Sequence, residues 1–437
     1  MNELHDAASR IIALARGLGA DEALASVSRG VSTDLSLRDG EIEKAQESRS
    51  LSASVSLYVD GRYSSHQTSD MRPDALQAFL ARAVDATRFL EADPNRRLPD
   101  RADMGEAEVE LDLVDPTPPA AEDGRARLLD LEAVVRDAAA DLRVRSVQAW
   151  LWRGRYESVR HTSHGFSASS ETTRFGHGAT LSIEDTDGRL PEAYSGYQAT
   201  HASDLLGPPE LAADLAQRAR ERLGSGPVDS GTYPLLLSNR VVSRVLGALT
   251  GGLDGTAIYE RRSFLLEKLG ERIAAEGFSL YDDPLRPRGL ASRRYDGDGL
   301  PAVRRAIIED GRLQSWLINT YNARRLGRPV TTGSTSNLLI PAGVRSPEAI
   351  VQSLPRVIRV DSFLGGNTNA ATGDFSFGIQ GALFEGGAKV ASLSEMNVSG
   401  NLLRLFEAWS EAADDVWTYG TLFSPSLLFS DVQFSGR

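Results

Sequence analysis

Four of the six histidines lie between residues 161 and 201, and their type and spacing raise the question of metal chemistry. His161 and His164 stand at HxxH spacing, which occurs in some zinc sites. All four, with His177 and His201, fall on expected strands at separations that give no regular coordination geometry. The pattern favours surface or cross-strand histidines. A divergent metal site built from His161, His164 and His177 is the alternative.

Other common catalytic patterns are missing from the sequence. The chain has no cysteine, which excludes disulfides, thiolate nucleophiles and cysteine-ligated metals. It contains no HExxH segment and no GxSxG nucleophile elbow. A phosphate-binding loop needs GxxxxGKS or GxxxxGKT before a helix, whereas here Gly251 and Gly252 follow a helical pattern and no lysine comes after them.

That helical pattern is VVSRVLGALTG, residues 241–251, and Asn239 is placed to cap its N-terminus. One face carries the apolar stripe of Val241, Val242, Val245, Leu246 and Leu249. The other face carries small residues, namely Ser243, Gly247 and Gly251. The pattern is typical of a core helix that ends in glycines, so the small-residue face is interpreted as a place of close packing.

The most glycine-rich segment is GGNTNAATGDFSFGIQGALFEGGAKVASLSEMNVSGNL, residues 365–402. Glycines in strands let another extended chain approach the backbone closely, which suits capture of a peptide by strand addition. A barrel-like sheet that needs glycines for its bends explains the segment equally well. On the first interpretation, the residues expected to contact a peptide are Gly366, Asn367, Asn369, Thr372, Gly373, Asp374, Phe375, Glu395 and Asn397.

These segments belong to a chain that predicts an α+β fold, because strands and helices are segregated along it. Residues 1–225 predict an N-terminal two-layer domain of antiparallel meanders and helices. Asp39-Gly40 and Asp60-Gly61 stand where hairpin turns need positive φ. The predicted helices cover residues 4–18, 73–92, about 121–143 and 208–224.

The order of helix, hairpin, long strand, turn and strand occurs in residues 1–92 and again in 121–225, which indicates an internal duplication. A Pro-, Asp- and Arg-rich linker, residues 93–120, joins the two halves. Residues 226–437 predict a strand-rich C-terminal domain with a few helices, one of them at 262–276. Turns at Asp310-Gly311 and Gly386-Gly387 separate its strands.

Composition limits the classes of partner. The 437 residues carry 48 Lys and Arg against 60 Asp and Glu, a formal net charge of −12, which argues against a nucleic-acid binder. No stretch of about 18 apolar residues occurs, so no membrane span is expected. The N-terminus has acidic residues and only a short apolar run, so it predicts an amphipathic helix without a signal peptide and a cytoplasmic protein.

Several segments together resemble the TldD/TldE family, also called PmbA or "modulator of DNA gyrase". In the first half these are GADEALASVSRG, SLRDGEIEKAQESRS and VSLYVDGRYSSHQTSD. In the second half they are NTYNARRLGRPVTTGS, GGNTNAATGDFSFGIQGALFEGG and EMNVSGNLL. The resemblance spans nearly the whole chain, and TGDFSFG followed by SGNL is its most specific part.

The resemblance implies a two-subunit zinc peptidase. TldD-like subunits carry HExxxH on a helix and a late cysteine, and the glutamate acts as general base on zinc-bound water. In this sequence Leu246 and Gly251 occupy the two histidine positions and Gly247 that of the glutamate. Together with the missing cysteine, this implies a TldE-type subunit that is no enzyme by itself, holds no cofactor, and relies on zinc in a TldD-like partner.

The resemblance further implies a hollow heterodimer that takes up unfolded or small peptides as added strands for proteolysis by the partner. The alternative is an autonomous homodimeric scaffold that binds peptides or proteins without proteolysis.

Overall fold

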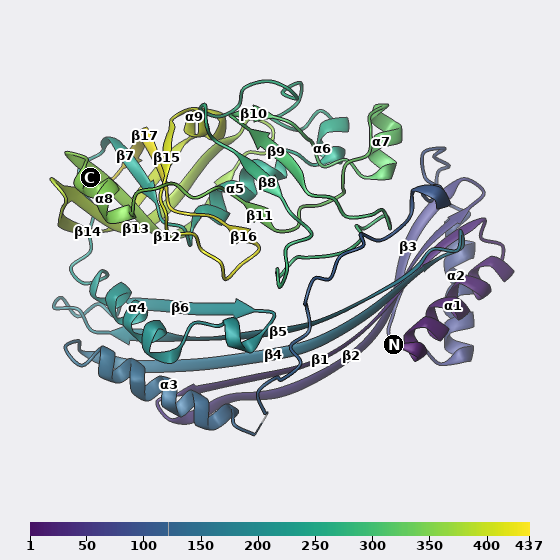
Figure 1. Ribbon diagram of the computed structural model, residues 1–437, viewed down its shortest axis with the longest axis horizontal. Coiled ribbons are helices and arrows are strands. Elements are labelled where there is room, and N and C mark those ends of the chain that lie inside the picture. The colour runs from purple at the N-terminus through teal and green to yellow at the C-terminus, as the bar shows by residue number, and fades with distance from the viewer. Residues whose placement is uncertain (121) are drawn as a thin grey trace.

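The structure is a computed structural model that describes residues 1–120 and 122–437. Its first half is one curved antiparallel sheet with strand order β3-β2-β1-β4-β5-β6 (Figure 1). The strands are β1 (Glu22–Arg38), β2 (Glu41–Val59), β3 (Arg62–Thr68), β4 (Val144–Thr162), β5 (Ser167–Ile183) and β6 (Glu192–Ala199). The helices are α1 (Asn2–Gly17), α2 (Pro73–Thr87), α3 (Gly124–Ala138) and α4 (Pro208–Arg220), with 3-10 turns at Arg101–Asp103 and Ala202–Asp204.

The predicted duplication is visible in this order of elements. A helix, three strands and a helix occur as α1-β1-β2-β3-α2 and again as α3-β4-β5-β6-α4. The first strand of each unit meets the other at the centre of the sheet, where β1 and β4 pair over fifteen residues, from Leu24 opposite Thr162 to Arg38 opposite Gln148. Residue 121, at the start of one predicted helix and of the second unit, lies outside the described residues.

The predicted hairpin turns form where the Asp-Gly pairs stand. Asp39 and Gly40 between β1 and β2 have φ of 51° and 83°, and Asp60 and Gly61 between β2 and β3 have 49° and 72°. Both residues of a type I′ turn need positive φ, which Asp tolerates and Gly adopts freely. The turns therefore set the register that places alternate side chains on the helix-covered face.

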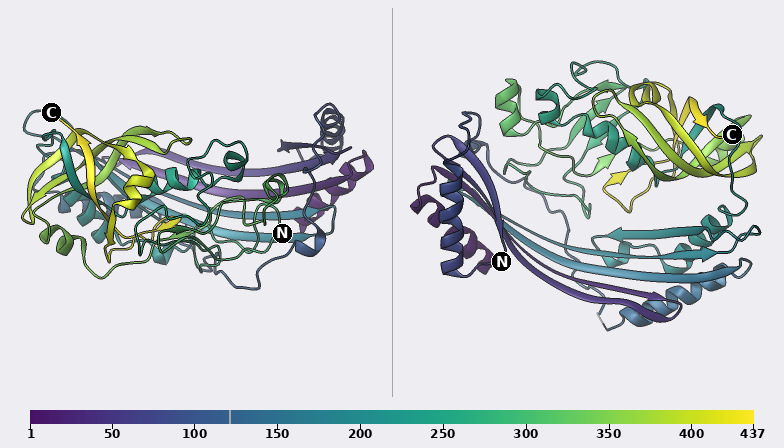
Figure 2. Two further views of the ribbon diagram at one scale, coloured as in Figure 1. Left: turned by 90° about the horizontal axis from the view of Figure 1, so that it is seen from above. Right: turned by 180° about the vertical axis from the view of Figure 1, so that it is seen from behind.

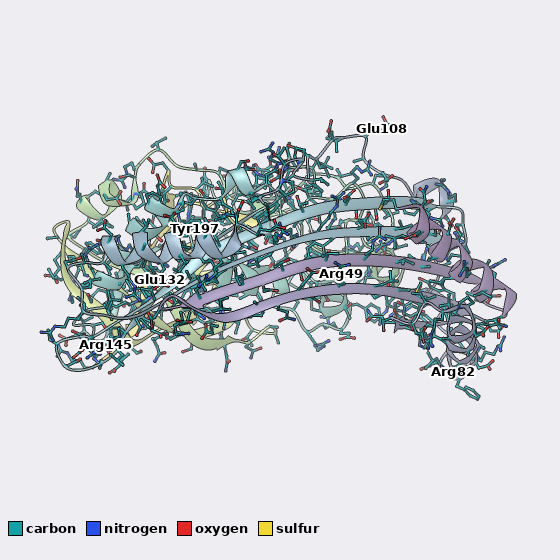
Figure 3. The ribbon with its side chains drawn as sticks, turned by 90° about the horizontal axis from the view of Figure 1, so that it is seen from below. Arg49, Arg82, Glu108, Glu132, Arg145 and Tyr197 are labelled. Carbon is teal, nitrogen blue, oxygen red and sulfur yellow. The ribbon has the colours of Figure 1, made fainter. Side chains whose placement is uncertain are left out.

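The helices cover only the two ends of one face of the sheet (Figure 3). One small core lies under α1 and α2, and a second lies under α3 and α4. Between them the strands are bare, and Val31 and Leu51 are 39% and 40% exposed. Residues 41–52 of β2 are all exposed and, within residues 1–120 and 122–437, pair only with β1, because β3 pairs with residues 53–59.

The predicted linker, residues 93–120, runs between the N-terminal sheet and the second half of the chain and contacts both. Leu98 packs against Phe166 beside β5, and its carbonyl accepts a hydrogen bond of 2.8 Å from Arg324 of the second half. The N–H of Gly105 donates to the carbonyl of Gly299 at 3.0 Å. These contacts hold the linker against both parts of the chain, so it is a packed part of the fold.

The second half contains a closed sheet and a smaller five-stranded sheet (Figure 2). The closed sheet runs β14-β13-β12-β7-β17 and back to β14, and β15 extends it beyond β17. Its strands are β7 (Gly231–Leu237), β12 (Arg356–Thr368), β13 (Asp374–Glu385), β14 (Ala388–Asn401), β15 (Trp409–Ala412) and β17 (Leu427–Ser435). The smaller sheet has β8 (Leu280–Asp282), β9 (Arg305–Glu309), β10 (Arg312–Leu313), β11 (Leu338–Leu339) and β16 (Leu422–Phe423).

One large core lies inside the closed sheet and under its helices. These helices are α5 (Val242–Gly251), α6 (Gly255–Tyr259), α7 (Thr320–Leu326) and α9 (Leu402–Glu407), whereas α8 (Pro347–Gln352) packs on a separate small core that includes Val357 and Leu428. Helices and strands are thus segregated, so the fold is α+β, as predicted. No helix in the described part of the chain, residues 1–120 and 122–437, is long and apolar enough to cross a membrane.

The predicted helix at residues 262–276 is wrong. This segment contains turns and no helix, because Glu267 and Gly270 take φ of 63° and 83°, which no α-helix accommodates. Its apolar side chains are buried all the same, with Leu265 and Ile273 at most 1% exposed. The apolar residues at helical spacing are therefore buried by tertiary contacts, although the segment that carries them forms turns and no helix.

Candidate functional site

Helix α5 begins at Val242 and lies with one face in the core of the second half. Its buried stripe is Val242, Val245, Leu246 and Leu249, each at most 3% exposed. The predicted capping by Asn239 is wrong: the helix starts after Val241, which offers no side-chain cap, and the Asn239 amide donates to the carbonyl of Asp415 at 2.6 Å. Asn239 thus ties the start of the helix to a distant loop.

The opposite face of α5 is open. Ser243, Arg244, Gly247 and Gly251 are exposed. A methyl group placed on Gly247 or Gly251 meets no heavy atom within 4 Å. The interpretation of this face as a place of close packing is therefore wrong, because periodicity identifies a shared face but not what lies opposite it. Glycine inside a helix is destabilising relative to alanine, so these residues leave space at a cost in stability.

Beside this face runs an edge of β12 that pairs with no other strand among the described residues. The parallel ladder between β7 and β12 ends at Val360, where the N–H of Ser238 donates to the Val360 carbonyl at 3.0 Å. Beyond it, residues 362–368 of β12 pair only with β13 within the described chain. A guanidinium nitrogen of Arg244 donates to the carbonyl of Gly366 at 2.9 Å, which fixes α5 against this edge.

We call Arg244, Gly247 and Gly251 of α5 together with residues 364–367 of β12 the α5–β12 surface. Leu364 is 57% exposed on it, and the Arg244 guanidinium lies 5.2 Å from the centroid of the Phe377 ring. The surface combines an open helix face, an apolar side chain and free backbone groups. Arg244 is its only charged side chain.

The turn that follows β12 is held by its own polar groups. The carbonyl of Asp374 accepts from the Asn369 N–H at 2.8 Å, and the Asp374 carboxylate accepts from the hydroxyl of Thr372 at 2.7 Å and the amide of Asn401 at 2.9 Å. Asn401 and Thr372 keep the pKa of Asp374 below its usual range. This carboxylate is thus occupied in shaping the turn.

Phe264 joins that turn to the end of α5. A methyl group on Gly252, just after the helix, would lie 2.7 Å from the Phe264 ring, and one on Gly373 in the turn would lie 3.0 Å from it. The N–H of Phe264 also donates to the carbonyl of Ala370 at 3.2 Å. Both glycines are therefore needed where the ring is wedged, unlike the two on the open face.

The predicted peptide-contacting residues divide into three sets. Gly366 and Asn367 lie on the free edge of β12, and Asn369, Thr372, Gly373 and Asp374 form the turn. Phe375 is buried in the core, stacked on Phe377, and is not available to a ligand. Glu395 and Asn397 are exposed on β14, one strand further away.

Of the β14 pair, Asn397 lies close to the surface. A methyl group placed on Gly378 of β13 would lie 3.5 Å from the Leu364 side chain and 3.6 Å from the side-chain oxygen of Asn397. Which of these residues contact a peptide remains a prediction. Sequence reasoning missed Arg244 and Leu364, although Arg244 is the only charged residue between Val241 and Gly251.

The α5–β12 surface does not fit zinc. Leu246 points into the core, and Gly247 and Gly251 have no side chains, so none of the three can ligate a metal or transfer a proton. Throughout residues 1–120 and 122–437, no group of three His, Asp or Glu side chains is arranged to hold a metal ion.

The four histidines of the HxxH region have separate partners. His161 hydrogen-bonds to His5 at 2.9 Å, and His164 lies 3.0 Å from the Glu22 carboxylate. His177 bonds to the Leu206 carbonyl at 2.8 Å. Burial lowers the pKa of both His161 and His177, and for His161 the neighbouring His5 adds to the effect.

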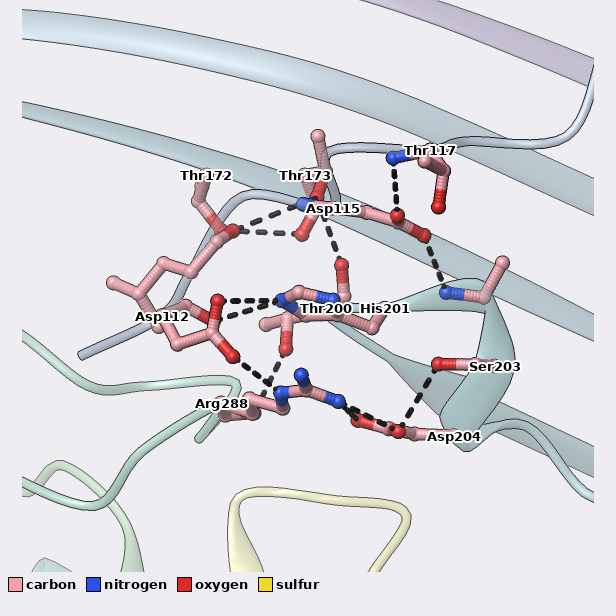
Figure 4. Close-up of polar contacts among 12 residues, drawn as sticks. Asp112, Asp115, Thr117, Thr172, Thr173, Thr200, His201, Ser203, Asp204 and Arg288 are labelled. Atoms are coloured by element: carbon pink, nitrogen blue, oxygen red, sulfur yellow. Dashed lines mark hydrogen bonds and ion pairs between the residues drawn. The ribbon is translucent and has the colours of Figure 1, made fainter.

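His201 belongs to an ion-pair cluster between the linker and the second half (Figure 4). Its ring bonds to the Asp112 carbonyl at 2.9 Å, and the Asp112 carboxylate accepts from Arg288 at 2.6 Å. Arg288 also pairs with Asp204 at 3.0 Å and holds the pKa of Asp112 below its usual range. Side chains from three segments of the chain are bonded to one another in this cluster. Its role is therefore structural, since it holds the linker against the second half.

Three family models match the chain. They are the PmbA/TldA metallopeptidase domain 1 over residues 23–87, the central domain over 114–223 and the C-terminal domain over 230–436. The metalloprotease PmbA of Escherichia coli O157:H7 is 28% identical, with 99% of this chain and 96% of the relative covered. A PmbA homolog from Haemophilus influenzae is 24% identical over 100% and 96%.

Solved structures agree with these matches. A crystal structure from Bacteroides thetaiotaomicron, named as a modulator of DNA gyrase, superimposes with a TM-score of 0.92 at 30% identity and covers 100% of both chains. TldE from Thermococcus kodakarensis superimposes with a TM-score of 0.86 at 19% identity over 98% of this chain and 100% of its own, which shows a shared fold.

Proposed function

The chain belongs to the PmbA/TldA metallopeptidase family, and from this premise we propose that it is the non-catalytic, TldE-type subunit of a zinc peptidase. A second, TldD-like chain carries the zinc and the general base. This chain shapes the chamber and supplies backbone that contacts unfolded or small peptides. The observation that carries the proposal is the α5–β12 surface, which is open to a ligand but holds no group that ligates zinc or moves a proton.

Two features of that surface suit an extended peptide. The edge of residues 362–368 offers backbone N–H and C=O groups that have no partner strand. Peptides that add a strand to such an edge gain affinity from main-chain hydrogen bonds, with little dependence on sequence. Gly247 and Gly251 leave space over the neighbouring helix face.

A mixing experiment tests the proposal. The chain alone should hold no stoichiometric zinc by elemental analysis and should not cleave an unstructured peptide. Addition of a TldD-like chain that contains HExxxH should give cleavage that a chelator abolishes. Chelator-sensitive cleavage by the lone chain, or full activity of the TldD-like chain without this one, would contradict the proposal.

Two arginine variants sharpen the test in the mixture. Arg244→Ala removes the contact with the Gly366 carbonyl and should lower kcat/KM several-fold. Arg404→Ala is the matched control, because Arg404 is exposed on α9 and, among the described residues, its ion pair is with Glu407 at 3.1 Å. Equal activity of the two variants would show that the α5–β12 surface does not contact substrate.

A homodimeric scaffold without proteolysis is the second candidate, and the bare edge of β2 favours it. Residues 41–52 are exposed along their whole length, and an unpaired edge is a template for pairing with another chain. The mass of the complex recovered from its host separates the two candidates. A one-to-one pair with an HExxxH chain supports the first, and a self-pair supports the second.

A further inference from the structure

A cavity of about 450 Å³ lies where the two halves of the chain meet. From the first half, Asp214 and Arg218 of α4 and Glu221, which directly follows the helix, contribute to its wall. From the second half come Arg240, just before α5, and Arg359 and Asp361 of β12. The aromatic rings of Tyr197, Trp417 and Tyr419 close one side.

The three carboxylates of the cavity are already paired. Asp214 lies 3.0 Å from Arg240. Glu221 and Asp361 lie 2.8 Å and 3.0 Å from Arg359. Two of the arginines thus account for all three acids.

Arg218 is left without a carboxylate within 4.0 Å among the described residues, and so is Arg222, which lies one helical turn further on and does not line the cavity. The Nε of Arg218 donates to the carbonyl of Tyr194 at 3.2 Å, which fixes the side chain but leaves its terminal nitrogens unused. Burial lowers the pKa of Arg218, and Arg240 adds to the effect by repulsion. Burial also lowers the pKa of Arg222, with Arg218 contributing. The cavity wall carries three arginines and three carboxylates and is formally neutral, but the terminal nitrogens of Arg218 have no partner among the described residues and can accept a further anion.

The cavity adjoins the start of the free edge of β12. Ser238 and Asp361 line it, and they flank Val360, where β7 stops pairing with β12. A peptide strand that lies along residues 362–368 must end here, because β7 occupies the edge from Val360 backward. A chain end at this point presents a terminal group to the arginines.

We propose that the cavity binds the C-terminal carboxylate of a peptide that lies along residues 362–368, with Arg218 as the principal contact. The proposal rests on the proposed function, in that it needs a peptide on this edge. The peptide then runs antiparallel to β12, with its last residue at Asp361 and its last side chain beside the aromatic wall. A guanidinium fork matches a carboxylate in geometry as well as in charge.

Matched peptides test the inference on the full-length chain. One peptide carries a free C-terminal carboxylate and the other a C-terminal amide, with the same sequence and a fluorophore at the N-terminus. The acid should bind about tenfold more tightly, since charge-assisted hydrogen bonds to a partly buried arginine are worth about that factor. Arg218→Gln should abolish the preference for the acid over the amide.

Arg220→Gln is the matched control. Arg220 lies on the same helix and loses the same charge, but it bonds to Asp141 at 2.9 Å and lines no part of the cavity. This variant should retain the preference for the acid. Equal effects of the two substitutions would show a general charge effect and overturn the inference.

The remaining outcomes separate this inference from the proposed function. Equal binding of acid and amide would overturn the carboxylate anchor and leave peptide binding intact. Absence of binding by both would overturn the two together. A third arm adds inorganic phosphate: displacement of the acid alone supports the anchor, whereas phosphate binding without any preference for the acid would reassign the cavity to free anions and overturn it.

Discussion

Gly247→Ala is the most direct probe of the open face of α5. Gly247 lies inside the helix, and a methyl group there meets no heavy atom within 4 Å. Alanine therefore gains helix propensity and loses no contact, which should raise the free energy of unfolding by about 1 kcal/mol. For a cooperative unit of roughly 200 residues, that corresponds to about 2–4 °C in Tm by calorimetry.

The same substitution should weaken binding while it stabilises the chain. If an extended peptide lies against the helix, the added methyl group fills the space that its backbone needs, so affinity should fall. Gly252→Ala is the control of opposite sign, because its methyl would lie 2.7 Å from Phe264 and should lower the Tm. Destabilisation by Gly247→Ala, or a stabilised variant with unchanged peptide affinity, would refute the reasoning.

Three further predictions concern stability and titration. Burial lowers the pKa of His177, so stability is present above the unfolded value of about 6.5 and is lost as pH falls through the folded pKa. His177→Gln should therefore flatten the decline in unfolding free energy between pH 7 and 5, measured by urea titration. Phe264→Ala should lower the unfolding free energy of the second half by about 3 kcal/mol, because its wedged ring leaves a cavity; a loss below 1 kcal/mol in urea would contradict the packing. Asn401→Ala removes the cap of α9, at about 1 kcal/mol, and should raise the pKa of Asp374 in an NMR titration.

Local signals in the sequence predicted local structure well. The Asp-Gly pairs adopt the positive φ that hairpins need, and the repeated order of elements became the two halves of the first sheet. The closed sheet could not be predicted from the sequence, because β7 pairs with β12 and β17, which lie far along the chain. No periodic pattern within a strand records which distant strand will lie beside it.

The site was predictable only in part for a related reason. The pattern of residues 241–251 identified a helix and its two faces, and the glycines of residues 365–402 marked a region of unusual backbone. The structure joined them through Arg244 and Gly366, which are far apart in sequence. It also showed that the small face of α5 is open, since burial depends on what the rest of the fold leaves uncovered.

The glycines around α5 differ in what their missing side chains make room for, and this difference supports a functional role for the open face of the helix. Gly252 and Gly373 are required by the Phe264 ring, so steric fit explains them. A methyl group on Gly247 or Gly251 would meet no heavy atom of the described residues within 4 Å, yet glycine at Gly247 sacrifices about 1 kcal/mol relative to alanine. A glycine that destabilises a helix without a compensating contact inside the fold indicates that the open space serves an interaction with another molecule.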